Sequence, residues 1–140
     1  MSSTCEILLD NETLLFRTQI TITSRKGRTI TLEAVIDTGS TYTVLSPIAV
    51  SCLGLRRCRQ PRQVSIRTVR GAVRADLYIA DQISITDTTI SAYNVKVTAP
   101  KVRYHPHRIP AILGMNFLNR FHWSYNPEKK ILRISKHPLK

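Results

Sequence analysis

Long apolar runs are absent from this 140-residue sequence, and acidic residues are few. No stretch approaches the ~20 consecutive apolar residues that a membrane-spanning helix requires, and the first residues, MSSTCEILLDNE, lack the basic and then apolar layout of a secretory signal. We therefore expect a soluble protein with no membrane partner, in the cytoplasm or another intracellular compartment. Excision from a longer polyprotein would leave the same pattern.

Cysteine and histidine are also scarce. The three cysteines, Cys5, Cys52 and Cys58, cannot all pair, and no cysteine or histidine cluster has the spacing of a zinc site. We interpret the cysteines as free thiols, with a bridge between Cys52 and Cys58 as the alternative. Because a phosphate loop, a Gly-x-Ser-x-Gly elbow and a suggestive Cys-His pair are missing too, we expect no metal and no organic cofactor.

Basic residues, in contrast, dominate the charge, with 21 Lys and Arg against 9 Asp and Glu and a net charge of +12. Seven arginines occupy one segment that contains no acidic residue: Arg56, Arg57, Arg59, Arg62, Arg67, Arg70 and Arg74. This segment is either a solvated basic face or an electrostatic site for a substrate or for nucleic acid, and the sequence leaves both interpretations open.

Short alternating runs of apolar and polar residues predict strands with one buried face. Residues 14–36 form the clearest case, a hairpin whose turn at residues 24–27 places Gly27 where a positive φ is needed. With 42% hydrophobic residues, a chain of this length can bury one core. We therefore predict a single all-β domain over residues 1–140.

The remaining elements follow from the same signals. Ser46 as N-cap, Pro47 as first helical residue and Gly54 as terminator predict a short helix, and Met115, Leu118 and Phe121 predict one face of a second. The other predicted segments are a hairpin over residues 64–66 and 73–79, strands at 83–85, 94–98, 111–114, 122–125 and 131–134, and a basic loop over 100–110. Residues 34–39 and 111–114 resemble each other weakly, each an apolar strand that ends at a glycine.

The strongest chemical signal is Asp37-Thr38-Gly39-Ser40, which follows a predicted strand. A carboxylate at a strand end can act as an acid or a base, although the same four residues also suit an ordinary surface turn. The flanking residues favour chemistry: Ala34-Val35-Ile36 precedes the motif, Thr41 to Ser46 follows it, and Ile112-Leu113-Gly114-Met115-Asn116-Phe117-Leu118 lies downstream.

This order resembles retropepsin-like aspartic proteases of retroviruses, retrotransposons and bacteria, over residues 18–135. The resemblance implies a closed β-barrel or sandwich, a two-fold homodimer, and catalysis by Asp37, Thr38, Gly39 and Ser40. It also implies that Ile112, Leu113 and Gly114 support the active-site loop from behind. Ser40 is expected to hydrogen-bond the Asp37 carboxylate.

The family's mobile hairpin, or flap, corresponds to residues around Gly71. By this resemblance the residues that would bind substrate are Gly39, Thr68, Val69, Arg70, Gly71 and Ala72. The substrate would be an extended polypeptide, hydrolysed by an activated water.

Aspartic proteolysis requires two carboxylates, one charged and one protonated. The other candidates, Asp10, Asp76, Asp81 and Asp87, are not followed by Thr-Gly or Ser-Gly. A second copy of the chain would supply the second Asp37. Where retroviral members tend to carry a paired acid and arginine, this sequence has Thr41 and Met115, so we expect the dimer to rely on apolar contacts and on the strand at 131–134.

Two other functions stay open. The chain could be a catalytically silent member of this fold that dimerises or binds peptides, with Asp37 kept only for shape. It could also be a basic nucleic-acid-binding β domain, although its aromatic residues are scattered and predict no stacking platform.

Overall fold

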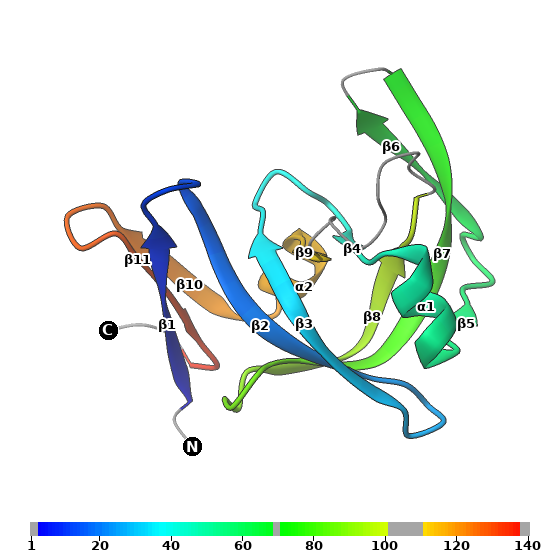
Figure 1. Ribbon diagram of the computed structural model, residues 1–140, viewed down its shortest axis with the longest axis horizontal. Coiled ribbons are helices and arrows are strands. Elements are labelled where there is room, and N and C mark those ends of the chain that lie inside the picture. The colour runs from blue at the N-terminus through cyan, green and yellow to red at the C-terminus, as the bar shows by residue number, and fades with distance from the viewer. Residues whose placement is uncertain (1–2, 69–70, 101–110, 138–140) are drawn as a thin grey trace.

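The chain is built mainly of strands in a computed structural model that describes residues 3–68, 71–100 and 111–137 (Figure 1). The strands are β1 (Thr4–Asp10), β2 (Leu15–Thr23), β3 (Thr29–Ile36), β4 (Thr43–Val44), β5 (Arg56–Arg57), β6 (Gln63–Thr68), β7 (Gly71–Ile85), β8 (Ser91–Thr98), β9 (Ala111–Leu113), β10 (His122–Asn126) and β11 (Ile131–Ser135). The helices are α1 (Pro47–Leu53) and α2 (Met115–Leu118). The predicted all-β class, with short helices after the Asp37 loop and near the C-terminus, is confirmed.

Six of the strands close into a barrel. Their order is β2-β3-β9-β4-β8-β7, and β7 then pairs with β2 through Ile20 opposite Ile85 and Ile22 opposite Ile83. These four isoleucines are almost completely buried, whereas Thr21 between them points outward and its hydroxyl lies 3.1 Å from that of Thr31. The alternation seen in the sequence therefore separates a dry interior from a polar exterior, as predicted.

Strands β3 and β9 lie side by side and parallel, with Ala34, Val35 and Ile36 opposite Ala111, Ile112 and Leu113. These are the two segments whose sequences resemble each other. Parallel neighbours end at the same edge of a sheet, so the loop after β3 and Gly114 after β9 meet there. That edge carries Asp37.

Helix α1 follows the predicted boundaries. The Ser46 hydroxyl accepts a hydrogen bond from the Ala49 N–H at 3.1 Å, Pro47 begins the helix, and Gly54 ends it with φ 64°. Ala49, Val50 and Leu53 pack this helix against the core. All three residues help to satisfy the backbone groups at the helix ends: Ser46 accepts from an N–H, Pro47 has no N–H to satisfy, and the Gly54 N–H donates to the Val50 and Ser51 carbonyls.

Helix α2 corrects one expectation. It is a single turn that ends before Phe121, and its buried residues are Phe117 and Leu118 rather than Met115, Leu118 and Phe121 together. Phe121 instead follows the helix and packs its ring 5.1 Å from that of Phe117. A spacing of three residues cannot define a helix face when only one turn forms.

The chain ends form a small antiparallel sheet with the order β10-β11-β1. Thr4–Asp10 was not predicted as a strand, yet β1 pairs with β11 and then with β2 through Leu9 opposite Phe16. Strand β11 therefore has neighbours on both edges. Figure 1 shows this sheet beside the barrel, on the side away from β7.

The β6–β7 hairpin extends away from the barrel, as Figure 1 shows at the upper end of β7. Its register runs from Gln63 opposite Asp76 to Thr68 opposite Gly71, while the turn residues 69–70 and the basic loop 101–110 lie outside the described residues. The cysteines are free, so Cys52 and Cys58 do not form the alternative bridge. Within the described residues no helix is long and apolar enough to cross a membrane.

Candidate active site

Asp37 lies directly after β3, at the edge where β3 and β9 end. Its backbone N–H donates to the Leu113 carbonyl at 3.0 Å, which ties the loop to the strand behind it, and its own carbonyl accepts from the Ser40 N–H at 3.2 Å. Residues 37–40 thus form a turn anchored on β9. The Asp37 side chain is partly exposed, and Thr38 and Gly39 are exposed.

The Asp37 carboxylate is oriented by the loop itself. Its Oδ1 accepts a hydrogen bond from the Gly39 N–H at 2.8 Å. The expectation that Ser40 would bind this carboxylate is wrong, because the Ser40 hydroxyl donates to the Tyr42 carbonyl at 2.7 Å. A backbone donor holds the carboxylate more rigidly than a rotating hydroxyl would, since its position is set by the turn.

Gly114 allows β9 and the Asp37 loop to approach closely. A Cβ at this position would lie 2.3 Å from the Tyr42 carbonyl oxygen and 2.8 Å from that of Ser40, both of them backbone atoms. The next residue, Met115, donates its N–H to the Ser40 carbonyl at 2.7 Å. The predicted position of Ile112, Leu113 and Gly114 behind the loop agrees with this geometry.

A polar pair, the buried Thr43 and the half-buried Asn116, joins the two halves of this region and was not found from the sequence. The Thr43 hydroxyl donates to Asn116 Oδ1 at 2.9 Å and accepts from the Gly114 N–H at 3.2 Å. Asn116 also donates its side-chain amide to the Lys96 carbonyl at 2.6 Å and its backbone N–H to the Thr41 carbonyl at 3.1 Å. These hydrogen bonds connect the segment after the Asp37 motif to the segment after β9. Thr41 and Met115 lie in these two segments and cannot form an ion pair.

One signal could have pointed to Thr43. In the alternating run 41–45 it occupies an inward position next to Leu45, and it is completely buried. A buried hydroxyl requires a partner, so an inward threonine close to the Asp37 motif indicates a structural hydrogen bond.

A cleft of about 500 Å³ opens in front of the loop. Its lining joins the Asp37 loop to strands β4, β6, β8 and β9, and it consists of Asp37, Gly39, Ser40, Thr41, Tyr42, Val44, Ser65, Ile66, Arg67, Thr98 and Ile112. Ser65, Ile66 and Arg67 belong to the β6–β7 hairpin, so that hairpin forms one wall.

The predicted substrate-binding residues fall in three groups. Gly39 lines the cleft. Gly71 and Ala72 begin β7 beyond the lining residues of the hairpin and do not border this cleft, while Thr68 ends β6. Val69 and Arg70 lie outside the described residues.

Asp37 is the only acid among the cleft residues of the described chain. The other aspartates have different partners: Asp10 accepts from the Thr13 hydroxyl at 2.9 Å, Asp76 lies 3.2 Å from Arg57, and Asp81 lies 3.7 Å from Arg56. No group of three or more potential metal ligands occurs among residues 3–68, 71–100 and 111–137. The described part of the cleft therefore holds one carboxylate, that of Asp37.

Residues 23–120 match the family model described as "gag-polyprotein putative aspartyl protease", which covers more than half of the chain. The chain belongs to this family. Aspartic proteolysis is the activity of the family, and the predicted membership is confirmed. No curated protein matches the sequence.

The structure is similar to the crystal structure of a retropepsin-like aspartic protease from Rickettsia conorii, with a TM-score of 0.67 and 17% sequence identity, over 94% of this chain and 89% of that one. This likeness confirms the retropepsin-like fold of the family member. The solution structure of Simian Foamy Virus (mac) protease is less similar, with a TM-score of 0.45 and 15% identity over 74% of this chain and 92% of that one.

Proposed function

We propose that this chain is an aspartic endopeptidase that acts as a homodimer, in which the two Asp37 carboxylates form the catalytic pair. The observation that carries the proposal is the cleft with a single acid: Asp37 stands at the wall of a peptide-sized cleft, held by the Gly39 N–H, and has no acidic partner there among the described residues. A two-fold axis near this loop would supply the partner without any further residue.

Two adjacent carboxylates share one proton, because their like charges separate the two titrations. In the resting pair one Asp37 is charged and the other is protonated. The charged carboxylate takes a proton from a water, whose oxygen attacks the scissile carbonyl carbon, while the protonated carboxylate donates its proton to the carbonyl oxygen. The resulting gem-diol then collapses: the carboxyl group that gained the water proton donates it to the amide nitrogen, the C–N bond breaks, and the other carboxylate takes a proton from one hydroxyl group as the carbonyl re-forms. The pair again holds one proton, and no covalent enzyme intermediate forms.

The neighbouring residues would position the pair and the substrate. The exposed Thr38 is free to reach backbone atoms of the second copy, and Gly39 leaves space for substrate next to the carboxylate. The β6–β7 hairpin, through residues 68–72, would close over an extended peptide and add main-chain hydrogen bonds while it excludes water.

The contact between copies would differ from the addition of a strand to β11, because β10 and β1 already occupy both edges of that strand. Several large apolar side chains are exposed instead, among them Leu8 of β1 and Leu14 of the β1–β2 turn, each 69% exposed. Tyr125 of β10 is also exposed, on the opposite face of the β10-β11-β1 sheet from Leu8, and its ring lies 5.4 Å from that of Phe16 in an edge-to-face contact. Burial of such side chains between two copies would make apolar packing the source of dimer stability.

The test is cleavage of an unfolded protein from acidic to neutral pH by the wild type and by Asp37→Asn. We expect cleavage by the wild type and none by Asp37→Asn. Asp87→Asn is the matched control, since Asp87 lies in a turn with φ 61°, a conformation that asparagine tolerates, and it should retain full activity. Cleavage that persists in Asp37→Asn would contradict the proposed catalyst, and a folded wild type without any activity would favour a silent binding module.

A further inference from the structure

The arginine-rich segment contains no lysine, since the chain has none between Lys26 and Lys96. In the structure, the arginines of this segment lie in different places. Arg67 lines the Asp37 cleft, and Arg70 lies outside the described residues. Arg57, Arg62 and Arg74 come together elsewhere, at the base of the β6–β7 hairpin, where with Pro61, Gln63 and Asp76 they line a separate hollow of about 560 Å³. We call it the arginine hollow.

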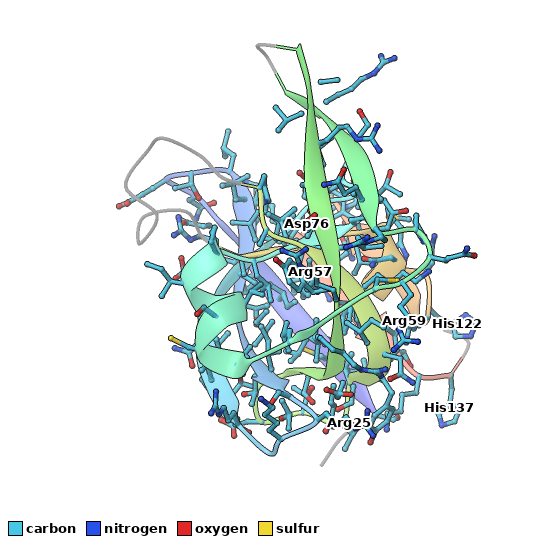
Figure 2. All side chains as sticks on the ribbon, turned by 90° about the vertical axis from the view of Figure 1, so that its right-hand side faces the viewer. Arg25, Arg57, Arg59, Asp76, His122 and His137 are labelled. Atoms are coloured by element: carbon cyan, nitrogen blue, oxygen red, sulfur yellow. The ribbon has the colours of Figure 1, made fainter. Side chains whose placement is uncertain are left out.

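Backbone pairing to Leu77 of β7 brings these arginines together. The Cys58 N–H donates to the Leu77 carbonyl at 2.7 Å, and the Leu77 N–H donates to the Arg62 carbonyl at 2.9 Å, so the loop after β5 begins and ends on the same residue. Arg57 and Arg62 at the two ends of the loop then stand near Arg74, which lies three residues before Leu77 on β7. Figure 2 faces this side of the molecule, with Arg57 next to Asp76 and Arg59 lower down.

The positive charge of the arginine hollow is only partly compensated. Its single acid among the described residues, Asp76, lies 3.2 Å from the Arg57 guanidinium and accepts from the Gln63 amide at 3.0 Å. Arg74 donates to the Gln63 oxygen at 3.2 Å, which is a neutral acceptor, and Arg62 makes no side-chain hydrogen bond or ion pair within the described residues. Three guanidinium groups therefore face one carboxylate.

The chemistry of this lining favours phosphate. Guanidinium groups donate two parallel hydrogen bonds to phosphate oxygens and lose less hydration than ammonium groups do. Pro61 is the only apolar residue of the described lining, so the hollow has no apolar pocket for the side chains of a peptide. The described lining has no aromatic residue to serve as a stacking platform either, which favours contacts with the phosphate backbone.

The surroundings extend the same charge beyond the hollow. Arg59 is exposed and has no ion pair among the described residues, and Arg56 has only the distant Asp81 at 3.7 Å. A ligand with regularly repeated phosphates would contact the hollow and these neighbours at once, while a single phosphate would use the hollow alone. We propose that the arginine hollow binds the phosphate backbone of nucleic acid, without preference for base sequence.

The test measures the affinity of a fluorescently labelled, mixed-sequence RNA 20-mer by anisotropy at several salt concentrations. The full chain with Asp37→Asn is used throughout, so that the result does not depend on proteolysis. Replacing Arg62 and Arg74 by glutamine should weaken binding at low salt about tenfold or more, and should flatten the slope of log K against log salt by about 1.4, or 0.7 for each lost phosphate contact.

The matched control removes the same charge elsewhere, with Arg25→Gln and Lys129→Gln, two exposed residues in the β2–β3 and β10–β11 turns. It should lose less than about threefold in affinity. Equal losses in the two double variants would contradict the proposal and assign binding to the net charge of +12. The proposal would also be overturned if the Asp37→Asn chain, with Arg62 and Arg74 intact, did not bind RNA at low salt.

Two further measurements complete the experiment. Arg62→Gln alone removes a side chain that holds no other described residue in place, so it should fold normally and still flatten the slope by about 0.7. Polyglutamate, added at the same concentration of negative charge, should compete poorly with the RNA. Equal competition by polyglutamate would overturn the nucleic-acid assignment in favour of an acidic polypeptide.

Discussion

Gly114 is the residue on which the position of the Asp37 loop depends most directly. A methyl group there would meet carbonyl atoms of Tyr42 and Ser40 at 2.3 to 2.8 Å, and backbone atoms cannot rotate away as a flexible side chain can. We expect Gly114→Ala to lower the free energy of unfolding by about 1–3 kcal/mol and to abolish most activity, because the loop must move. Urea unfolding and the cleavage assay measure the two effects.

Gly27→Ala separates the effect of crowding from that of backbone conformation. Gly27 has φ 80°, but no atom lies within 4 Å of the place that a methyl group would occupy, so alanine should cost about 1 kcal/mol through φ alone and leave activity intact. An equal loss of activity in the two variants would contradict the role given to close packing at Gly114.

Asp10 provides a prediction about pH. Its carboxylate accepts from the Thr13 hydroxyl and the Glu12 N–H, and these bonds, the hydroxyl first, hold the pKa of Asp10 below its usual value. A lowered pKa stabilises the fold above the unfolded-state pKa of about 4, and this contribution is lost as the pH falls through the folded value. Asp10→Asn should therefore be less stable than the wild type at neutral pH, and the difference should shrink below pH ~4.

The control for Asp10 is Glu12→Gln, which removes a neighbouring charge whose side chain makes no hydrogen bond or ion pair within the described residues. Thermal unfolding of the three proteins between acidic and neutral pH gives the comparison. A difference between Asp10→Asn and wild type that grows toward acidic pH would have the wrong sign for this account.

Residue types with one dominant use were predictable from the sequence. The motif and its spacing singled out Asp37, Gly39 and Gly114 as site residues, which stays a prediction, while Ser46 and Gly54 were predicted correctly because helix ends require such residues. Thr43, Asn116 and the Ser40 hydroxyl were missed or given the wrong partner. Their roles depend on which backbone carbonyls come within reach after β3, β4 and β9 assemble, and such contacts between distant segments leave no local pattern.

Helix α1 offers a test at the level of one element. Ser46→Ala removes the acceptor for the Ala49 N–H and should lower the free energy of unfolding by about 1 kcal/mol. Ser51→Ala is the matched control in the same helix, since the Ser51 side chain is exposed and alanine favours helix, so stability should stay unchanged or rise slightly. Chemical denaturation measures both changes, and similar losses would show that the cap contributes little.

Elements whose apolar residues recur at a regular spacing were predicted well. Elements whose conformation depends on contacts with distant segments were not. The β2–β3 hairpin follows from alternation and a glycine turn. Strand β1 reads as Thr-Cys-Glu-Ile-Leu-Leu-Asp, with only Ile7 fully buried, so its strand character comes from pairing with β11 at the other end of the chain. Helix α2 was assigned too long for the same reason, because tertiary packing of Phe117 and Phe121 sets its end.

At the scale of the whole molecule, the barrel positions the half of an active site that the proposed mechanism assigns to one chain. The parallel contact of β3 with β9 fixes the Asp37 loop at one edge, and the β6–β7 hairpin forms one wall of the cleft beside it. The closed barrel could be predicted from the family resemblance, whereas the pairing of both chain ends within one copy could not, since it depends on long-range register. The proposal of a second copy depends most on the single acid among the described residues of the cleft.

The most direct test of that claim is to mix wild-type chains with Asp37→Asn chains at a concentration where both are dimeric, and to measure cleavage per wild-type chain. If each active site needs two Asp37 residues, an equal amount of the variant should lower this activity by about half, because random pairing converts half of the wild-type chains into inactive mixed dimers. The Asp87→Asn, Asp37→Asn double variant should have the same effect. Activity per wild-type chain that is unchanged by the variant would contradict a catalytic pair shared between two copies.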